Sequence, residues 1–134
     1  MVKQIPHTSD LGIFVSSKTL EGLFKDSVKG FLILVGKVSR EKTNPKKKKL
    51  EIKGQSTEEI LVSFLNELIF LFYFKSLYPE KIKSIKIQGK KLFSEILFSK
   101  IKNFSNIHEI KSATFYNLKV EKNFLFKATI FFDV

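Results

Sequence analysis

The spacing of apolar residues changes near Pro79, and this change limits the folds that the chain can adopt. Before Pro79, apolar residues in two segments, 20–35 and 60–72, recur three and four positions apart, which is the spacing of one helix face. After Pro79, apolar and polar residues alternate, as they do in a strand with one buried face. The sequence therefore predicts two helices, followed by a region built of strands.

Both predicted helices have recognisable ends. Thr19 is the expected N-cap of the first helix, and Gly36 follows its last periodic residue. Ser56 and Glu59 have the spacing of a capping box, in which each side chain bonds a backbone amide of the first turn of the second helix. Phe70 lies off the apolar stripe of the second helix, and we expect a neighbouring loop to cover it rather than a protein partner.

Strands are expected before, between and after the helices. They cover residues 2–5, 11–16, 50–53, 85–87, 92–101, 111–120 and 124–134, and residues 38–49 are expected to form a polar connector. The resulting order is β-β-α-β-α-β-β-β-β. It predicts the α+β class, with a two-layer single domain over residues 1–134 in which two helices pack on one face of a mainly antiparallel sheet.

The last of these strands has the clearest alternation. One face carries Phe124, Phe126, Ala128, Ile130 and Phe132, and the other carries Leu125, Lys127, Thr129, Phe131 and Asp133. We expect the first face to pack on the core, because it is entirely apolar. Asp133 is then predicted to point away from the core.

Length and composition exclude several classes of protein. The 134 residues suit one domain with its own core, and the absence of cysteine excludes disulfides, thiolate metal sites and a cysteine nucleophile. The longest apolar run, residues 60–74, is shorter than the roughly 20 residues that cross a bilayer. The first ten residues resemble no targeting segment, so we expect a cytoplasmic protein that does not contact membranes.

The net charge of +11 indicates attraction to polyanions. Arg40 is the only arginine, however, and lysine lacks the bidentate geometry with which arginine reads bases and clamps phosphates. We therefore expect non-specific contact with RNA or with acidic partners rather than sequence-specific readout. The run Lys46 to Lys49 is interpreted as a solvated loop, with an RNA-steering or partner-docking patch as the alternative.

The chain contains three aspartates, and two of them lie near opposite termini, which are often close together in single domains. Asp10, Asp133 and the terminal carboxylate of Val134 would meet if the first and last strands lay side by side. An oxygen-only cluster of this kind binds hard cations. Taken singly, Asp10 is more typical of a turn or cap and Asp133 of a solvated strand end.

Five ordered stretches of the sequence resemble the archease family. Near the start, His7 to Ile13 resembles the family motif His-Thr-Ala-Asp-x-Gly, and Thr19 to Phe24 resembles the opening of its first helix. In the middle, Phe64 to Phe72 resembles the helix that contains Leu-Asn-Glu-Leu. Towards the end, Glu109 to Phe115 resembles Glu-Val-Lys-Ala-x-Thr-Tyr, and Phe132 to Val134 resembles the acidic carboxyl end. Together they extend over essentially the whole chain, so the chain is identified as similar to archeases throughout.

The resemblance implies a function and a set of residues. Archeases are accessory proteins of the RNA ligase that joins tRNA halves, so a protein similar to them is expected to promote the histidine-guanylate intermediate and repeated turnover of that ligase, without being an enzyme itself. Asp10, Asp133 and Val134 match the metal-binding positions of the family, and Lys111 matches a lysine associated with its activity. The expected cofactor is a divalent cation with oxygen ligands, namely calcium, magnesium or manganese.

The sequence also departs from the family pattern. Tyr116 replaces a histidine found in many members, and Asn117 replaces a glycine. Phe104 and Ile107 stand where a His-x-x-Lys is expected. These replacements put in doubt any role for the second cluster of family residues, which lies outside the metal-binding positions. His108 does not align with the missing histidine and is expected at the surface.

The sequence leaves both the role of the cation and the class of function open. The cation could organise the fold or be delivered to the ligase, where it would offset charge on a nucleotide triphosphate. The rival functions are a stand-alone basic RNA-binding module and a metal-dependent hydrolase that uses Asp10 and Asp133 as ligands. The hydrolase is disfavoured, because the sequence offers no obvious general base beside those two aspartates.

Overall fold

The computed structural model describes residues 1–5, 10–106 and 109–134. The elements are β1 (Val2–Ile5), β2 (Leu11–Ser17), α1 (Leu20–Val35), β3 (Gly36–Arg40), β4 (Lys46–Lys53), α2 (Thr57–Phe74), β5 (Leu77–Gln88), β6 (Lys91–Asn106), β7 (Ser112–Ala113), β8 (Glu121–Asn123) and β9 (Leu125–Asp133). No helix in these residues is both long enough and apolar enough to cross a membrane.

Both helices begin where the sequence predicts, and α1 also ends at the predicted Gly36. The Thr19 hydroxyl accepts a hydrogen bond from the Gly22 amide at 2.9 Å, and the Ser56 hydroxyl accepts one from the Glu59 amide at 3.1 Å. Gly36 closes α1 with a φ of 95°, a conformation that a side chain would disfavour. Local capping chemistry is therefore enough to fix these helix ends.

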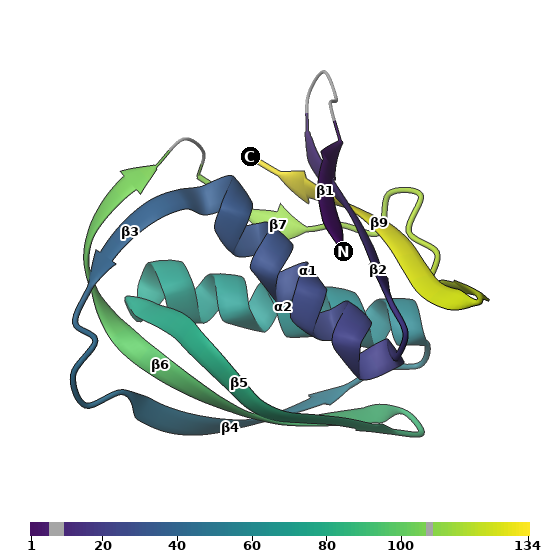
Figure 1. Ribbon diagram of the computed structural model, residues 1–134, viewed down its shortest axis with the longest axis horizontal. Helices are drawn as coiled ribbons and strands as arrows, with labels where there is room; N and C mark the ends of the chain where they lie inside the picture. Colours follow the sequence, from purple (N-terminus) through teal and green to yellow (C-terminus); the bar gives the residue numbers. More distant parts are fainter. Residues whose placement is uncertain (6–9, 107–108) are drawn as a thin grey trace.

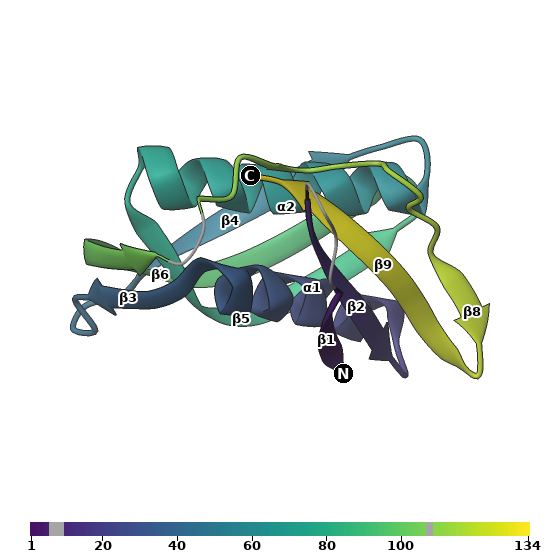
Figure 2. The same cartoon turned by 90° about the horizontal axis from the view of Figure 1, so that it is seen from above.

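The strands form two antiparallel sheets, so the predicted α+β class with antiparallel pairing is confirmed. One sheet has the order β1-β2-β9-β7, with β8 also paired to β9; the other has the order β3-β6-β4, with β5 also paired to β6. The sequence predicted one sheet with both helices on one face, whereas the structure has two sheets. The four-stranded sheet curves around one side of the helix pair, and β2 and β9 lie on the other side (Figures 1 and 2). α1 packs mainly against β2, whereas α2 contacts β5, β7 and β4.

One aromatic core joins both helices to both sheets. Its largest fully buried side chains include Phe24, Phe31, Phe64, Phe72, Phe98 and Phe132. The Phe31 ring meets the Phe72 ring edge-on, with centroids 5.5 Å apart, and lies 6.3 Å from the Phe132 ring. Full burial of each such side chain contributes about 1.5–3 kcal/mol, so α1, α2 and β9 are held together by a shared core.

The region between the helices differs from the expected polar connector. Residues Gly36–Arg40 form β3, and Lys46–Lys49 belong to β4, where Lys49 pairs with Glu95. The prediction of a solvated loop for these lysines is therefore wrong. Pairing with β6 overrides the lack of apolar alternation, and lysines suit a strand at the edge of a sheet because they oppose pairing with another chain.

Three smaller expectations are also wrong. Of the predicted strand 111–120, only Ser112–Ala113 pairs in a sheet, as β7. Phe124 has a φ of 64° and is 98% exposed, because it forms the turn between the paired residues Asn123 and Leu125 rather than a core position. Phe70 is 44% exposed and stacks on Phe74, with ring centroids 5.4 Å apart, so no loop covers it.

Candidate metal site

Strand β9 has a partner on each side near its end, and the pairing defines the candidate site. Leu11 of β2 is opposite Phe132, and Asp10, which directly precedes β2, would be opposite Asp133 if the same register continued by one residue. On the other side of β9, Ser112 of β7 is opposite Asp133. Residues directly opposite in antiparallel strands point to the same face, with Cβ atoms about 4.5–5.5 Å apart. We give the name carboxylate rim to Asp133 and Ser112 together with the two predicted ligands next to them in the chain, Asp10 before β2 and the terminal carboxylate of Val134 after β9.

The strand that meets β9 here is the second one in the chain, not the first. Among the described strands, β1 pairs only with β2, on the side away from β9, so it is the start of β2 and the end of β9 that lie side by side (Figure 1). Asp133 is exposed, Asp10 is half-buried, and Val134 is 43% exposed. The expectation that Asp133 points away from the core is thereby confirmed.

Backbone and side-chain contacts hold Asp133 in place. The Lys111 amide donates to the Asp133 carbonyl oxygen at 2.8 Å, and the Ser112 hydroxyl donates to the Asp133 carboxylate at 3.3 Å. Within residues 1–5, 10–106 and 109–134, neither Asp10 nor Asp133 forms an ion pair, although the chain carries a net charge of +11. Like charges opposite each other destabilise a sheet, and a cation between them would reverse the sign of that effect.

The donor set of the rim suits a hard cation. It consists of carboxylate and hydroxyl oxygens, which are the ligands that calcium, magnesium and manganese take in proteins. The described part of the chain has no group of three or more His, Cys, Asp or Glu side chains that could hold a metal. A cation at the rim would thus depend on the Ser112 hydroxyl and the Val134 carboxylate in addition to the two aspartates.

Helix α2 positions the segment that contains Ser112. The Asn66 side chain bonds the Ala113 backbone twice: its Oδ1 accepts from the Ala113 amide at 2.7 Å, and its Nδ2 donates to the Ala113 carbonyl at 3.3 Å. Further along α2, the Tyr73 hydroxyl accepts from the Ile110 amide at 2.9 Å. β7 is the last strand in the order of its sheet, and these bonds satisfy backbone groups of its segment that no further described strand pairs.

Lys111 lies beside the rim but faces another surface. Neighbouring residues of an extended chain alternate in direction, so Lys111 and Ser112 point to opposite faces. Lys111 is exposed and borders a surface cavity of about 400 Å³ together with residues of α2, including Ile69, Tyr73 and Phe74. The backbone of Lys111, the predicted activity residue, therefore lies next to the rim, but its side chain points to a different surface from the predicted metal ligands.

The positions that depart from the family pattern fit their local surroundings. Asn117 has a φ of 49°, a conformation that asparagine tolerates better than most residues other than glycine. The ring of Tyr116 meets the Phe131 ring edge-on at 5.4 Å, and Phe104 stacks on Tyr73 at 5.9 Å. The expectations for residues 7–9, Ile107 and His108 fall outside the described residues.

Two residues of the site were not singled out from the sequence. Ser112 follows Lys111 directly, and only the register shows that it faces Asp133. Asn66 is noticeable in the sequence, because it is a polar residue within the apolar run of residues 60–74. Its partner could not be identified, because Ala113 is 47 residues away.

Solved structures with the same fold are known. The structure aligns over 100% of its length with 98% of an archease from Thermotoga maritima that is described as a possible chaperone, at 27% identity and a TM-score of 0.72. It also aligns over 99% of its length with 98% of protein 1598 of Methanobacterium thermoautotrophicum, with a TM-score of 0.76. The identity in that second case is 20%, so it supports the fold alone.

Sequence comparisons agree with the structural ones. Protein archease of Thermoplasma volcanium is 25% identical over 95% of both chains, and that of Thermococcus kodakarensis is 28% identical over 87% of this chain and 84% of its own. Protein archease of Thermoplasma acidophilum is 38% identical, but the alignment spans only 49% of this chain and 46% of that protein, about half of each. The model of the Archease protein family matches residues 3–134, and the chain belongs to this family.

Proposed function

We propose that this archease is a non-enzymatic accessory protein that activates the RNA ligase of tRNA splicing or RNA repair in the cytoplasm. It would promote formation of the ligase's histidine-guanylate intermediate and so allow each ligase molecule to act repeatedly. The observation that carries the proposal is the Ser112–Asp133 pair, together with Asp10 directly before Leu11, the β2 residue opposite Phe132. These are oxygen ligands in a protein whose family relationship is established by the match over residues 3–134.

The rim supports an accessory role through a bound divalent cation, either calcium, magnesium or manganese. Asp10, Asp133 and the Val134 carboxylate would supply its negative charge, and Ser112 would orient the Asp133 carboxylate. A cation there would supply positive charge close to the nucleotide phosphates of a docked ligase. Because the rim ends a sheet and has exposed members, a partner protein can reach it.

Lys111 would act on the partner rather than on the cation. Its ammonium group has no ion pair within the described residues, and its side chain points to the α2 side of the sheet, away from the rim. A free lysine beside a cavity lined by Ile69, Tyr73 and Phe74 suits contact with an acidic group of the ligase or with its nucleotide. This division assigns metal binding to the rim and contact with the partner to Lys111.

The proposal predicts stimulation of the cognate ligase. Guanylylation of the ligase and multiple-turnover joining of tRNA halves should both rise when the protein is added. Lys111→Ala should lose most of the stimulation while binding the cation as the wild type does, whereas Lys119→Ala, another exposed lysine of the same segment, should retain it. Radiolabelled GTP transfer and ligated product measure the two steps. Unchanged guanylylation and unchanged turnover would contradict the proposal, and turnover of a phosphoester by the protein alone would favour the hydrolase alternative.

A further inference from the structure

Strands β4, β6 and β5 present an outer face that differs in composition from the rest of the surface. Strand β6 lies in the middle, and its buried residues Leu92, Ser94, Ile96 and Phe98 point inward, so the residues between them point outward. Cross-strand register then defines a surface that we call the lysine face. It consists of Lys47, Lys49, Glu51 and Lys53 from β4, Lys91, Phe93, Glu95 and Leu97 from β6, and Lys81, Ser84, Lys86 and Gln88 from β5.

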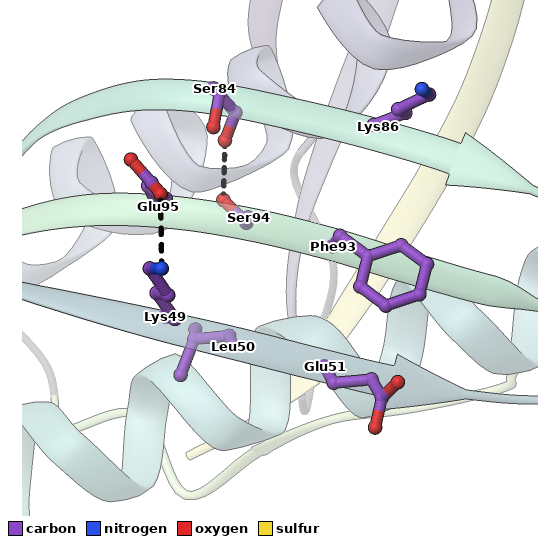
Figure 3. Close-up of a pocket in the computed structure, with 8 residues that line it drawn as sticks. All are labelled: Lys49, Leu50, Glu51, Ser84, Lys86, Phe93, Ser94 and Glu95. Carbon is purple, nitrogen blue, oxygen red and sulfur yellow. Dashed lines mark hydrogen bonds and ion pairs between the residues drawn. The ribbon is translucent and has the colours of Figure 1, made fainter.

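Phe93 is the central feature of the lysine face. Its ring is 40% exposed on the middle strand, and Figure 3 shows it lying between Lys86 on one side and Glu51 on the other. These residues line a shallow cavity of about 380 Å³ on the sheet surface. The core lies on the opposite side of the sheet, so the Phe93 side chain is not part of it and is available to a ligand.

The face is strongly basic, and its acidic residues neutralise little of the charge. Six lysines and two glutamates give it a net charge of +4. Glu95 lies 3.7 Å from Lys47 and 3.8 Å from Lys49, and such long, exposed ion pairs are weak. Lys53, Lys81 and Lys86 form no ion pair with any described residue.

We propose that the lysine face binds single-stranded RNA, with a base stacked on Phe93 and phosphates held by the surrounding lysines. Aromatic side chains on a sheet stack with unpaired bases of any sequence, and flanking cations follow the backbone of the strand. Lysine, as a mobile point charge, suits this non-specific role better than a sequence-reading one. The choice of RNA over DNA rests on the proposed function, since the ligase acts on RNA.

Edge protection, duplex RNA and an acidic protein partner each account for less of the lysine face. Protection of edge strands explains lysines on β4 and β5, but it does not explain an exposed phenylalanine on the middle strand. Duplex RNA would use the lysines and leave Phe93 without a role, because its bases are already stacked. An acidic protein would meet only Phe93 and Leu97 as apolar contacts, which is little for an interface that typically buries about 800 Å² per partner.

The test is a fluorescence-anisotropy titration of a labelled 12-nucleotide single-stranded RNA over a range of salt concentrations, without ligase. Phe93→Ala should weaken binding by roughly 5- to 100-fold, the range expected for the loss of one stacked base, and should leave the dependence on salt unchanged. Lys86→Gln should instead reduce the slope of log affinity against log salt by about 0.7, the value for one phosphate contact to a single strand. The two variants thus separate stacking from charge.

Matched controls make the result specific. Phe93→Trp should keep the affinity, because it keeps an aromatic surface. Phe70→Ala removes a phenylalanine of similar exposure on α2, and Lys29→Gln removes an exposed lysine on α1; both should bind as the wild type does. Wild-type affinity in Phe93→Ala would overturn the proposal, as would equal affinity for a duplex of the same sequence or for polyglutamate. Because the assay contains no ligase, failure to bind RNA and failure to stimulate ligation are separate outcomes.

Discussion

The carboxylate rim and the lysine face lie on different sheets and are built in different ways. The rim depends on single positions: Ser112 is opposite Asp133, Asp10 directly precedes β2, and Asn66 fixes the strand that carries Ser112. The lysine face depends on strand alternation, which repeats the same type of side chain many times. One changed residue should therefore disable the rim, whereas the basic charge of the face should decline gradually as lysines are removed.

The aspartates of the chain are also kept apart from the lysine face. Of the three aspartates, Asp26 pairs with the amino-terminal ammonium group at 2.8 Å, and the other two lie at the rim. A cation-binding site and a polyanion-binding face would interfere with each other if they were mixed. Their separation onto two sheets would allow the protein to hold a cation at one place and RNA at another.

The largest effect on stability is expected from Asn66→Ala. This change leaves the amide and carbonyl of the buried Ala113 without partners, which should cost about 2–4 kcal/mol in the free energy of unfolding. It should also weaken cation binding, because Ser112 loses its support. Urea denaturation and calorimetry measure the two effects. Ser63→Ala, which removes another polar side chain from α2, should change neither, and an Asn66→Ala variant that matched it would show that α2 does not support the rim.

A smaller effect is expected from Tyr73→Phe, which removes the acceptor of the Ile110 amide and should cost about 1–2 kcal/mol. Burial raises the pKa of Tyr73 above its usual value of about 10. A raised folded-state pKa favours the neutral hydroxyl in the folded protein, so this stability is complete below pH 10 and is lost as the pH rises through the folded pKa. Denaturation midpoints between pH 8 and 12 should fall less steeply for Tyr73→Phe than for the wild type; equal slopes would contradict this assignment.

The helices could be predicted from the sequence because their signals are local. Thr19 and Gly36 cap α1, Ser56 caps α2 by accepting from the Glu59 amide, and the apolar stripes have the helical period. The division into two sheets could not be predicted in the same way. Alternation shows that a segment is extended, but it does not show which strand it pairs with.

The errors have particular physical causes. The alternation of β4 is hidden in Lys46–Lys49, because all four residues are lysines and only pairing with β6 makes them a strand. The segment 111–120 has the composition of a strand, but side chains of α2 satisfy its backbone: Asn66 bonds Ala113, and Glu58 accepts from the Val120 amide at 2.8 Å. Such side-chain partners are distant in sequence and leave no local pattern.

The candidate site was partly accessible from the sequence. The scarcity of aspartate and the position of two aspartates near the termini indicated Asp10 and Asp133, and the pairing of β2 with β9 places the start of β2 beside the end of β9. The role of Ser112 required the register of β7, which is only two residues long. The sequence thus indicated two candidate ligands, and the structure added the residues that would position Asp133.

The central claim is that Asp10 and Asp133 share one divalent cation, and calorimetric titration tests it most directly. Calcium, magnesium and manganese should each be titrated into the wild type, Asp10→Ala, Asp133→Ala, Asp26→Ala and a chain extended beyond Val134. Tight binding to the wild type should be abolished in Asp10→Ala and in Asp133→Ala, because either change leaves a hard cation with too few anionic oxygens. It should persist in Asp26→Ala and weaken in the extended chain, in which the terminal carboxylate becomes a neutral amide. Undiminished binding by both Asp10→Ala and Asp133→Ala, with folding intact, would contradict the shared site.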